Sequence, residues 1–184
     1  SAGTTAMVAR AWGAKNYAEA ARVTSASLWV GNGVALMLTV LCIVFAYDIA
    51  SVFGLNETTT RLAAEFIQIL AIFNVSFAIN MILGAALRAS GDAKTPLWIG
   101  VLMNIVNVFL VYALVFGHFG LPKMGTSGAA LASGLSFTVA AVVLLLALYG
   151  KQLRIQAGGV GSITVARVKQ LYQIGYPAAV EQFI

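Results

Sequence analysis

The segment Leu83–Asn107, LGAALRASGDAKTPLWIGVLMNIVN, places a short charged loop between two apolar stretches. Gly91 can adopt a positive φ, and Asp92 or Thr95 can cap a helix that Pro96 starts. The sequence therefore predicts two apolar helices that meet at this loop. Two such helices, joined tightly through basic residues, are typical of a membrane hairpin that turns at the cytoplasmic face.

The composition of the whole chain agrees with a membrane protein. Of its 184 residues, 60% are hydrophobic and 9% are charged, whereas about a quarter of residues are charged in soluble domains. The formal net charge is +5, but the basic residues stand at the ends of apolar runs and form no basic stripe, so nucleic acid is not expected as a partner. The single cysteine, Cys42, excludes an intrachain disulfide and a cysteine metal cluster.

Four intervals free of charged residues locate the predicted spans. They contain 25, 22, 28 and 27 residues and lie between Arg22 and Asp48, Glu65 and Arg88, Lys94 and Lys123, and Lys123 and Lys151. Each is long enough for one helical crossing of about 20 residues and too short for two. Because backbone groups in hydrocarbon must be satisfied within the segment, these spans are expected to be helices. We place them at about 24–47, 62–87, 97–116 and 125–149.

The remaining segments are predicted to connect these spans. Residues 1–9 have the character of the end of an earlier helix, and residues 10–23 form a basic connection. Asp48–Thr60 is predicted to be a loop, in which Asn56 suits the start of a new helix. A cytoplasmic connection is expected at 151–170 and the start of a further span at 171–184. Both ends of the chain look cut, so we expect a fragment of a longer protein.

The orientation of the chain follows from its basic residues. Placing residues 10–23, 88–96 and 150–170 on one side gathers nine of the Lys and Arg residues there and leaves Arg61 and Lys123 on the other. Cytoplasmic loops carry such an excess of positive charge. The nine-to-two distribution therefore predicts that the first set of segments is cytoplasmic.

Small residues indicate where helices approach each other closely. The run GTSGAALASG at 125–134 is rich in glycine, alanine and serine. Transmembrane helices associate through such residues, because lipid provides no hydrophobic drive for their association. The run is interpreted either as plain packing or as a surface that slides during transport.

No catalytic constellation is present, so an enzyme is not expected. The single histidine, His118, stands in a predicted loop without a carboxylate or serine near it in sequence. No spacing of His, Cys, Asp and Glu fits a metal site. A structural role is the simpler interpretation of this histidine.

Polar residues inside the spans are the candidates for function, because they are costly in lipid and usually face a bundle interior or a wet cavity. Asn104 and Asn107 are three residues apart and are predicted to share one helix face. Either they line a substrate or ion pathway, or they only join helices. Further candidates are Asn74 and Asn80 in the second span, with Asn32 in the first.

Glu181 and Gln182 follow Pro177 by about one turn. If the Glu181 carboxylate is buried in the span, it is a candidate for coupling to a cation. The alternative is a carboxylate that stays hydrated at the membrane edge.

Several motifs together resemble one transporter family. They are Leu87–Pro96 (LRASGDAKTP), Asn104–Asn107 (NIVN), Gly117–Ser133 (GHFGLPKMGTSGAALAS), Val8–Lys15 (VARAWGAK) and Gly175–Gln182 (GYPAAVEQ). In their order and spacing they look like the multidrug and toxic compound extrusion (MATE) family. The resemblance covers nearly the whole chain.

This resemblance implies an all-α, polytopic membrane helix bundle that forms most of one six-helix lobe of a two-lobed (6+6) transporter. Residues 1–150 would hold the end of helix two and helices three to six of the N-lobe, 151–170 the inter-lobe connection, and 171–184 the start of helix seven in the C-lobe. Relatives are antiporters that export cationic, amphipathic compounds in exchange for Na⁺ or H⁺ by alternating access. The implied location is the bacterial inner membrane, with the lipid bilayer and the missing C-lobe as partners.

The resemblance also implies roles for single residues. Asn107 matches an asparagine of the family's N-lobe pocket, and Glu181 fits members that carry a Glu-Gln pair after the proline. Four residues after Asn107 many relatives have Asp or Asn, whereas this chain has Val111, which argues against the usual N-lobe cation site. No cofactor other than the coupling ion is expected.

Two other functions stay open. A related lipid-linked saccharide flippase should need cationic side chains in its cavity to hold a pyrophosphate, and the predicted spans contain no Lys or Arg. A membrane scaffold that does not transport would have no need of asparagine pairs or of a glutamate within its spans.

Overall fold

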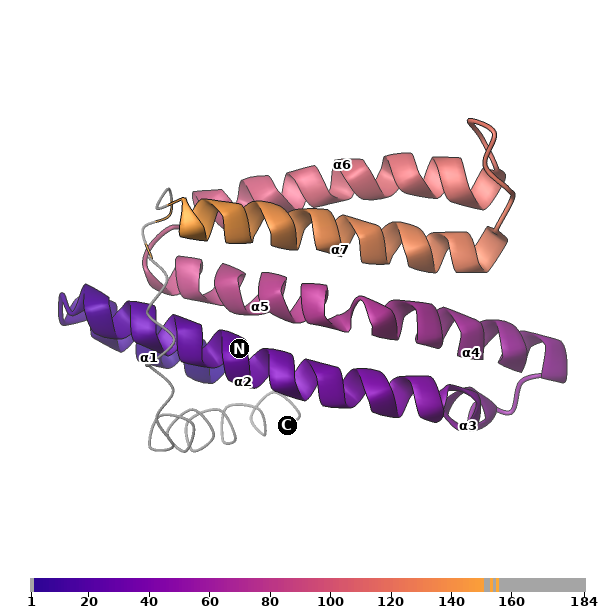
Figure 1. Ribbon diagram of the computed structural model, residues 1–184, viewed down its shortest axis with the longest axis horizontal. Coiled ribbons are helices and arrows are strands. Elements are labelled where there is room, and N and C mark those ends of the chain that lie inside the picture. The colour runs from indigo at the N-terminus through magenta and orange to yellow at the C-terminus, as the bar shows by residue number, and fades with distance from the viewer. Residues whose placement is uncertain (1, 151–152, 154, 156–184) are drawn as a thin grey trace. The chain divides into compact units, whose positions relative to one another are not determined.

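The computed structural model describes residues 2–150, 153 and 155, and every regular element among them is a helix (Figure 1). The elements, in chain order, are α1 (Ala2–Gly13), α2 (Tyr17–Val44), α3 (Ala46–Ser51), α4 (Glu57–Ile72), α5 (Asn74–Ala89), α6 (Lys94–Phe116) and α7 (Gly125–Tyr149). The all-α fold expected from the sequence is therefore observed. Of the predicted connection 151–170 the structure describes only residues 153 and 155, and the predicted segment 171–184 lies outside the described residues.

Three of the described helices, α2, α6 and α7, are long and apolar enough to cross a membrane, and the bent pair α4–α5 can provide a fourth crossing. The helix α6 extends three residues before the predicted start at 97 because the side chain of Asp92 caps it. Asp92 Oδ1 accepts a hydrogen bond from the Thr95 amide at 3.1 Å, and Oδ2 accepts one from Thr95 Oγ1 at 2.7 Å. Of the two capping residues considered, Asp92 is the acceptor.

The end of α5 is set by the conformation of Gly91 and by two backbone hydrogen bonds. Gly91 has a φ of 80° and its amide donates to Arg88 O, while the Asp92 amide donates to Leu87 O at 2.9 Å. This pattern of hydrogen bonds satisfies the last carbonyls of α5 and requires a residue that tolerates the left-handed conformation. The segment Leu87–Thr95 therefore ends α5 and starts α6 through hydrogen bonds among its own residues.

Three further sequence predictions differ from the structure. Most of the predicted connection 10–23 is helical, since α1 continues to Gly13 and α2 begins at Tyr17; its many alanines favour helix beyond the hydrocarbon core. The predicted loop 48–60 begins within the short helix α3. The second span, expected to be one continuous helix, bends by 54° between Ile72 and Asn74.

The described chain packs as two compact units, and each of α2, α5, α6 and α7 contributes to both. One unit comprises 2–32, 78–99 and the described residues from 142 onward. Its core has two clusters: the first joins α1, α2 and α5 through Val8, Ala11, Ala20, Val23 and Ala86 with Ile155, and the second joins α5 and α7 through Leu83, Leu87, Leu144 and Leu148 with Leu153.

The other unit comprises 33–77 and 100–141. Its small buried cluster joins α3 to α4 through Ala46, Ala50 and Ala64. The helices α6 and α7 run side by side (Figure 1), and they approach so closely that a Cβ at Gly128 would lie 2.8 Å from Leu114 O. The small-residue run 125–134 therefore contains a site of close helix packing, as the sequence predicted.

Candidate functional site

Asn107 lies half-buried on α6 and faces α7. Its Nδ2 donates a hydrogen bond to Ser133 Oγ at 3.4 Å. This distance is long for a hydrogen bond, so the contact is weak. The amide can therefore change partners at little cost, which suits a group that binds a ligand transiently.

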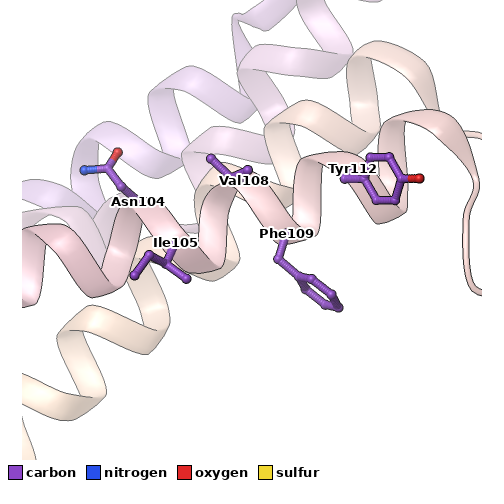
Figure 2. A pocket seen from close by; sticks show the side chains of 5 residues that line it. All are labelled: Asn104, Ile105, Val108, Phe109 and Tyr112. Carbon is purple, nitrogen blue, oxygen red and sulfur yellow. The ribbon is translucent and has the colours of Figure 1, made fainter.

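Asn104 has different surroundings. It is exposed, and its Nδ2 donates to Gly100 O of its own helix at 2.9 Å. Asn104 lines an open hollow of about 540 Å³ together with Ile105, Val108, Phe109 and Tyr112. Figure 2 shows these five side chains on α6. The hollow is therefore apolar except for this one amide and Tyr112 Oη.

The predicted shared face of Asn104 and Asn107 does not become one joint polar site among the described residues. Residues three apart on an α-helix point about 60° from each other. One amide can therefore meet a neighbouring helix while the other points away from it. Of these two amides, only that of Asn107 bonds to a polar group of another helix within the described part of the chain.

The other sequence-predicted residues are spread along the chain. Asn74 Nδ2 donates to Ala35 O of α2 at 3.1 Å, so this amide joins two helices. Asn80 lies half-buried on α5 and has an interaction partner. Asn32 Oδ1 on α2 is buried and accepts no hydrogen bond within the part of the chain that the structure describes. Glu181 and Gln182 lie outside the described residues.

A set of interhelical contacts at the bend between α4 and α5 was not found by sequence reasoning. Thr39 Oγ1 of α2 donates to Ala71 O at 2.9 Å, in the last turn of α4, where the backbone amide of Phe73 also donates to this carbonyl. Asn74 donates to α2 just after the bend. The bend is thus fixed by hydrogen bonds from α2, without a proline.

The helix α7 supports the same bend from another direction. The ring of Phe73 packs against the backbone at Gly134, where a Cβ would overlap the ring. Ser76 Oγ and Thr138 Oγ1 are 3.1 Å apart and share a hydrogen bond. The only sequence signal for these contacts was the presence of small and hydroxyl residues in the spans.

The chemistry available from these residues is that of neutral amides and hydroxyl groups. Amide oxygens can accept hydrogen bonds or face a cation, and amide nitrogens can donate. The described residues contain no group of three His, Cys, Asp or Glu side chains that could hold a metal ion. From Thr95 to Pro122, moreover, the chain contains no Asp, Glu, Lys or Arg. The arrangement therefore suits reversible binding through hydrogen bonds.

Comparison with known proteins identifies the family of the chain. Residues 1–113 match the family model MatE. The chain is 30% identical to the "Probable multidrug resistance protein NorM" of Thermotoga maritima over all of this chain and 40% of that protein. It thus spans about two-fifths of the length of the relative.

Solved structures show the same fold. An inward-facing structure of a multidrug resistance MATE family transporter of the MOP superfamily is similar with a TM-score of 0.86 at 22% identity, over 98% of this chain and 41% of that one. An outward-facing structure is similar with a TM-score of 0.87 at 22% identity, over 99% of this chain and 40% of that one. The MatE model covers well over half of the residues, and its members are membrane transporters and not enzymes. The chain therefore belongs to the MatE family and provides most of one six-helix lobe of its two-lobed fold.

Proposed function

We propose that the chain is part of a secondary active multidrug efflux antiporter, which exports cationic, amphipathic compounds in exchange for Na⁺ or H⁺. The observation that carries this proposal is the match of residues 1–113 to the MatE family. Relatives named as probable multidrug resistance proteins in Thermotoga maritima and Bacillus cereus support efflux as the activity. The long apolar helices support a multi-pass protein, for which we propose the bacterial inner membrane.

The mechanism we propose is alternating access by rocking of two lobes. The fold of this chain is equally similar to an inward-facing and an outward-facing transporter. This supports a lobe that keeps its internal fold while its orientation changes. The interhelical bonds of Thr39 and Asn74, which join α2 to the bent span, give a physical basis for such rigidity.

Within this lobe we propose Asn107 as a substrate or ion pathway residue. Asn107 has a weak bond to Ser133 of another helix, which supports such a role. Asn104 is bonded to its own helix, which gives less support for a role in the pathway. Val111, one turn after Asn107, provides no carboxylate. We therefore propose that Glu181, with Gln182 beside it, supplies the coupling charge on the C-lobe side of the pathway.

The proposal is tested by efflux of ethidium from cells that express the full-length protein, under imposed Na⁺ or H⁺ gradients. Export that follows one of the two gradients is expected, and it would identify the coupling ion. Absence of export under both gradients, with the protein shown to be inserted, would contradict the proposal and favour the flippase. A scaffold would also give no export, and it would differ from the flippase in moving no lipid-linked saccharide across the membrane.

A further inference from the structure

The outer end of α6 and the loop after it carry an aromatic cluster formed by Phe109, Tyr112, Phe116, His118 and Phe119. The rings of Tyr112 and His118 stack with centroids 4.2 Å apart and an angle of 13° between their planes. Phe119 completes the cluster, with its ring centroid 5.6 Å from that of Phe109 and 6.5 Å from that of Tyr112. Phe109, Tyr112 and Phe116 belong to the last turns of α6, and the loop after the helix folds back so that His118 and Phe119 contact their rings.

The cluster is exposed although it is apolar. Phe119 is 72% exposed, Phe116 59% and Phe109 57%. Phe109 and Tyr112 also line the open hollow along α6, and Figure 2 shows their side chains on this helix. Aromatic rings exposed at the end of a membrane-crossing helix are typical of the membrane–water interface.

The loop holds the cluster in a fixed conformation. Phe119 has a φ of 59°, which is unusual for a bulky residue. The His118 amide donates to Ala113 O at 3.0 Å, and the Met124 amide donates to Leu114 O at 3.0 Å, so the loop is tied to the end of α6 at two points. The exposed position of Phe119 is therefore imposed by the backbone.

The position and charge of the cluster indicate what covers it. With 23 residues, α6 is about 34 Å long, slightly more than the hydrocarbon core of a bilayer. Its end therefore lies at the level of the headgroups, where rings with a polar edge such as tyrosine are favoured. Exposed Lys123 belongs to the same loop, and the sequence contains no Asp or Glu between Asp92 and Glu181 to balance its charge.

We propose that the aromatic cluster and Lys123 bind the phospholipid interface of the outer leaflet. The rings lie among the glycerol and upper acyl groups, and the Lys123 ammonium contacts a lipid phosphate. This gives a role to Lys123, which is one of only two basic residues, with Arg61, on the predicted outer side of the membrane. The loop then anchors the α6–α7 hairpin at a fixed depth.

The test is a spin label on Phe119→Cys, in the full-length protein with its other cysteines replaced and reconstituted in phosphatidylethanolamine–phosphatidylglycerol bilayers. Collision rates are measured with oxygen, which concentrates in lipid, and with a water-soluble nickel chelate. Thr58→Cys in the first turn of α4, an exposed site, is the aqueous control. We expect an oxygen-to-nickel ratio several-fold higher at residue 119 than at residue 58.

Two results at residue 119 would overturn the proposal. A ratio equal to that of the control would mean that water covers the cluster, and a label that neither reagent reaches would mean that protein covers it. Lys123→Gln tests the phosphate contact: the label should move toward water, and Lys123→Arg should restore its depth. An unchanged depth in Lys123→Gln would exclude the phosphate contact.

Discussion

At the scale of single residues, the structure separates two asparagines that the sequence treats alike. Asn107 has a weak bond to a side chain of another helix, whereas Asn104 donates to its own helix at 2.9 Å beside an apolar hollow. A polar side chain that reaches the next helix can take part in a pathway between helices. The local spacing of the two residues could not reveal this difference.

Replacement of Asn107 by alanine should therefore lower efflux in the full-length protein more than replacement of Asn104. Loss of one such polar contact is worth about 0.6 to 1.4 kcal/mol, which corresponds to a roughly threefold to tenfold loss of transport rate. Initial rates of ethidium efflux measure this, at equal amounts of inserted protein. Equal effects of Asn104→Ala and Asn107→Ala would contradict the assignment.

The coupling role of Glu181 gives a second prediction at this scale. Glu181→Gln keeps the shape of the side chain and removes its charge, so export driven by an ion gradient should be lost while insertion is retained. Glu57→Gln, which removes a carboxylate at an exposed site in the first turn of α4 and leaves Glu181 in place, is the matched control and should keep coupled export. If Glu181→Gln exports at the rate of the parent, another carboxylate supplies the coupling.

At the scale of the helix, the bend of the second span depends on contacts across the fold. The bend contains no proline, and its last-turn carbonyl at Ala71 is satisfied by Thr39 of α2. A hydrogen bond from a neighbouring helix supports a bend of this kind, because few other donors reach a backbone carbonyl within a membrane. The sequence, which reads as one continuous apolar helix, does not show this contact.

Thr39→Val should weaken the bend. It leaves Ala71 O without its hydroxyl donor and should lower the free energy of unfolding by about 1 to 2 kcal/mol. The measurement is the thermal unfolding midpoint of the purified full-length protein, followed by circular dichroism. Thr39→Ser retains the donor and should behave as the parent; a loss of the same size in both variants would assign the effect to packing.

Gly128→Ala should destabilise the α6–α7 contact. The added Cβ meets Leu114 O, a backbone atom that cannot rotate away, so the two helices must separate at a cost of about 1 to 3 kcal/mol. Gly100→Ala on α6 is the control, because a Cβ there meets no atom within 4 Å. It should be neutral or stabilising in the same unfolding measurement, whereas an equal loss in both variants would refute close packing at Gly128.

At the scale of the whole molecule, the distribution of charge predicts the orientation of the chain. Nine of its eleven Lys and Arg residues belong to segments placed on one side of the membrane. A cysteine at exposed Thr58 should react with an impermeant maleimide in intact cells that express the full-length Cys42→Ala protein. One at exposed Ala93 should react only after the cells are opened. The reverse pattern would invert the topology.

The sequence by itself determined the features that depend on local chemistry and on lipid as a solvent. Its charge-free intervals located the four predicted crossings, and Gly91 with Asp92 determined the tight turn between α5 and α6. The motifs around this turn indicated the family, and the match over residues 1–113 confirmed it. These features need only neighbouring residues or an apolar environment, so no tertiary contact is required to predict them.

Only the tertiary structure decided which polar groups meet across helices. The bond from Thr39 to Ala71 O, the packing of Phe73 at Gly134 and the different surroundings of Asn104 and Asn107 all join residues that are distant in sequence or depend on a neighbouring helix. The rotation of each helix about its axis sets these contacts, and it follows from packing with small residues. A nearly uniform apolar sequence does not specify that rotation, because every face of such a helix is compatible with lipid.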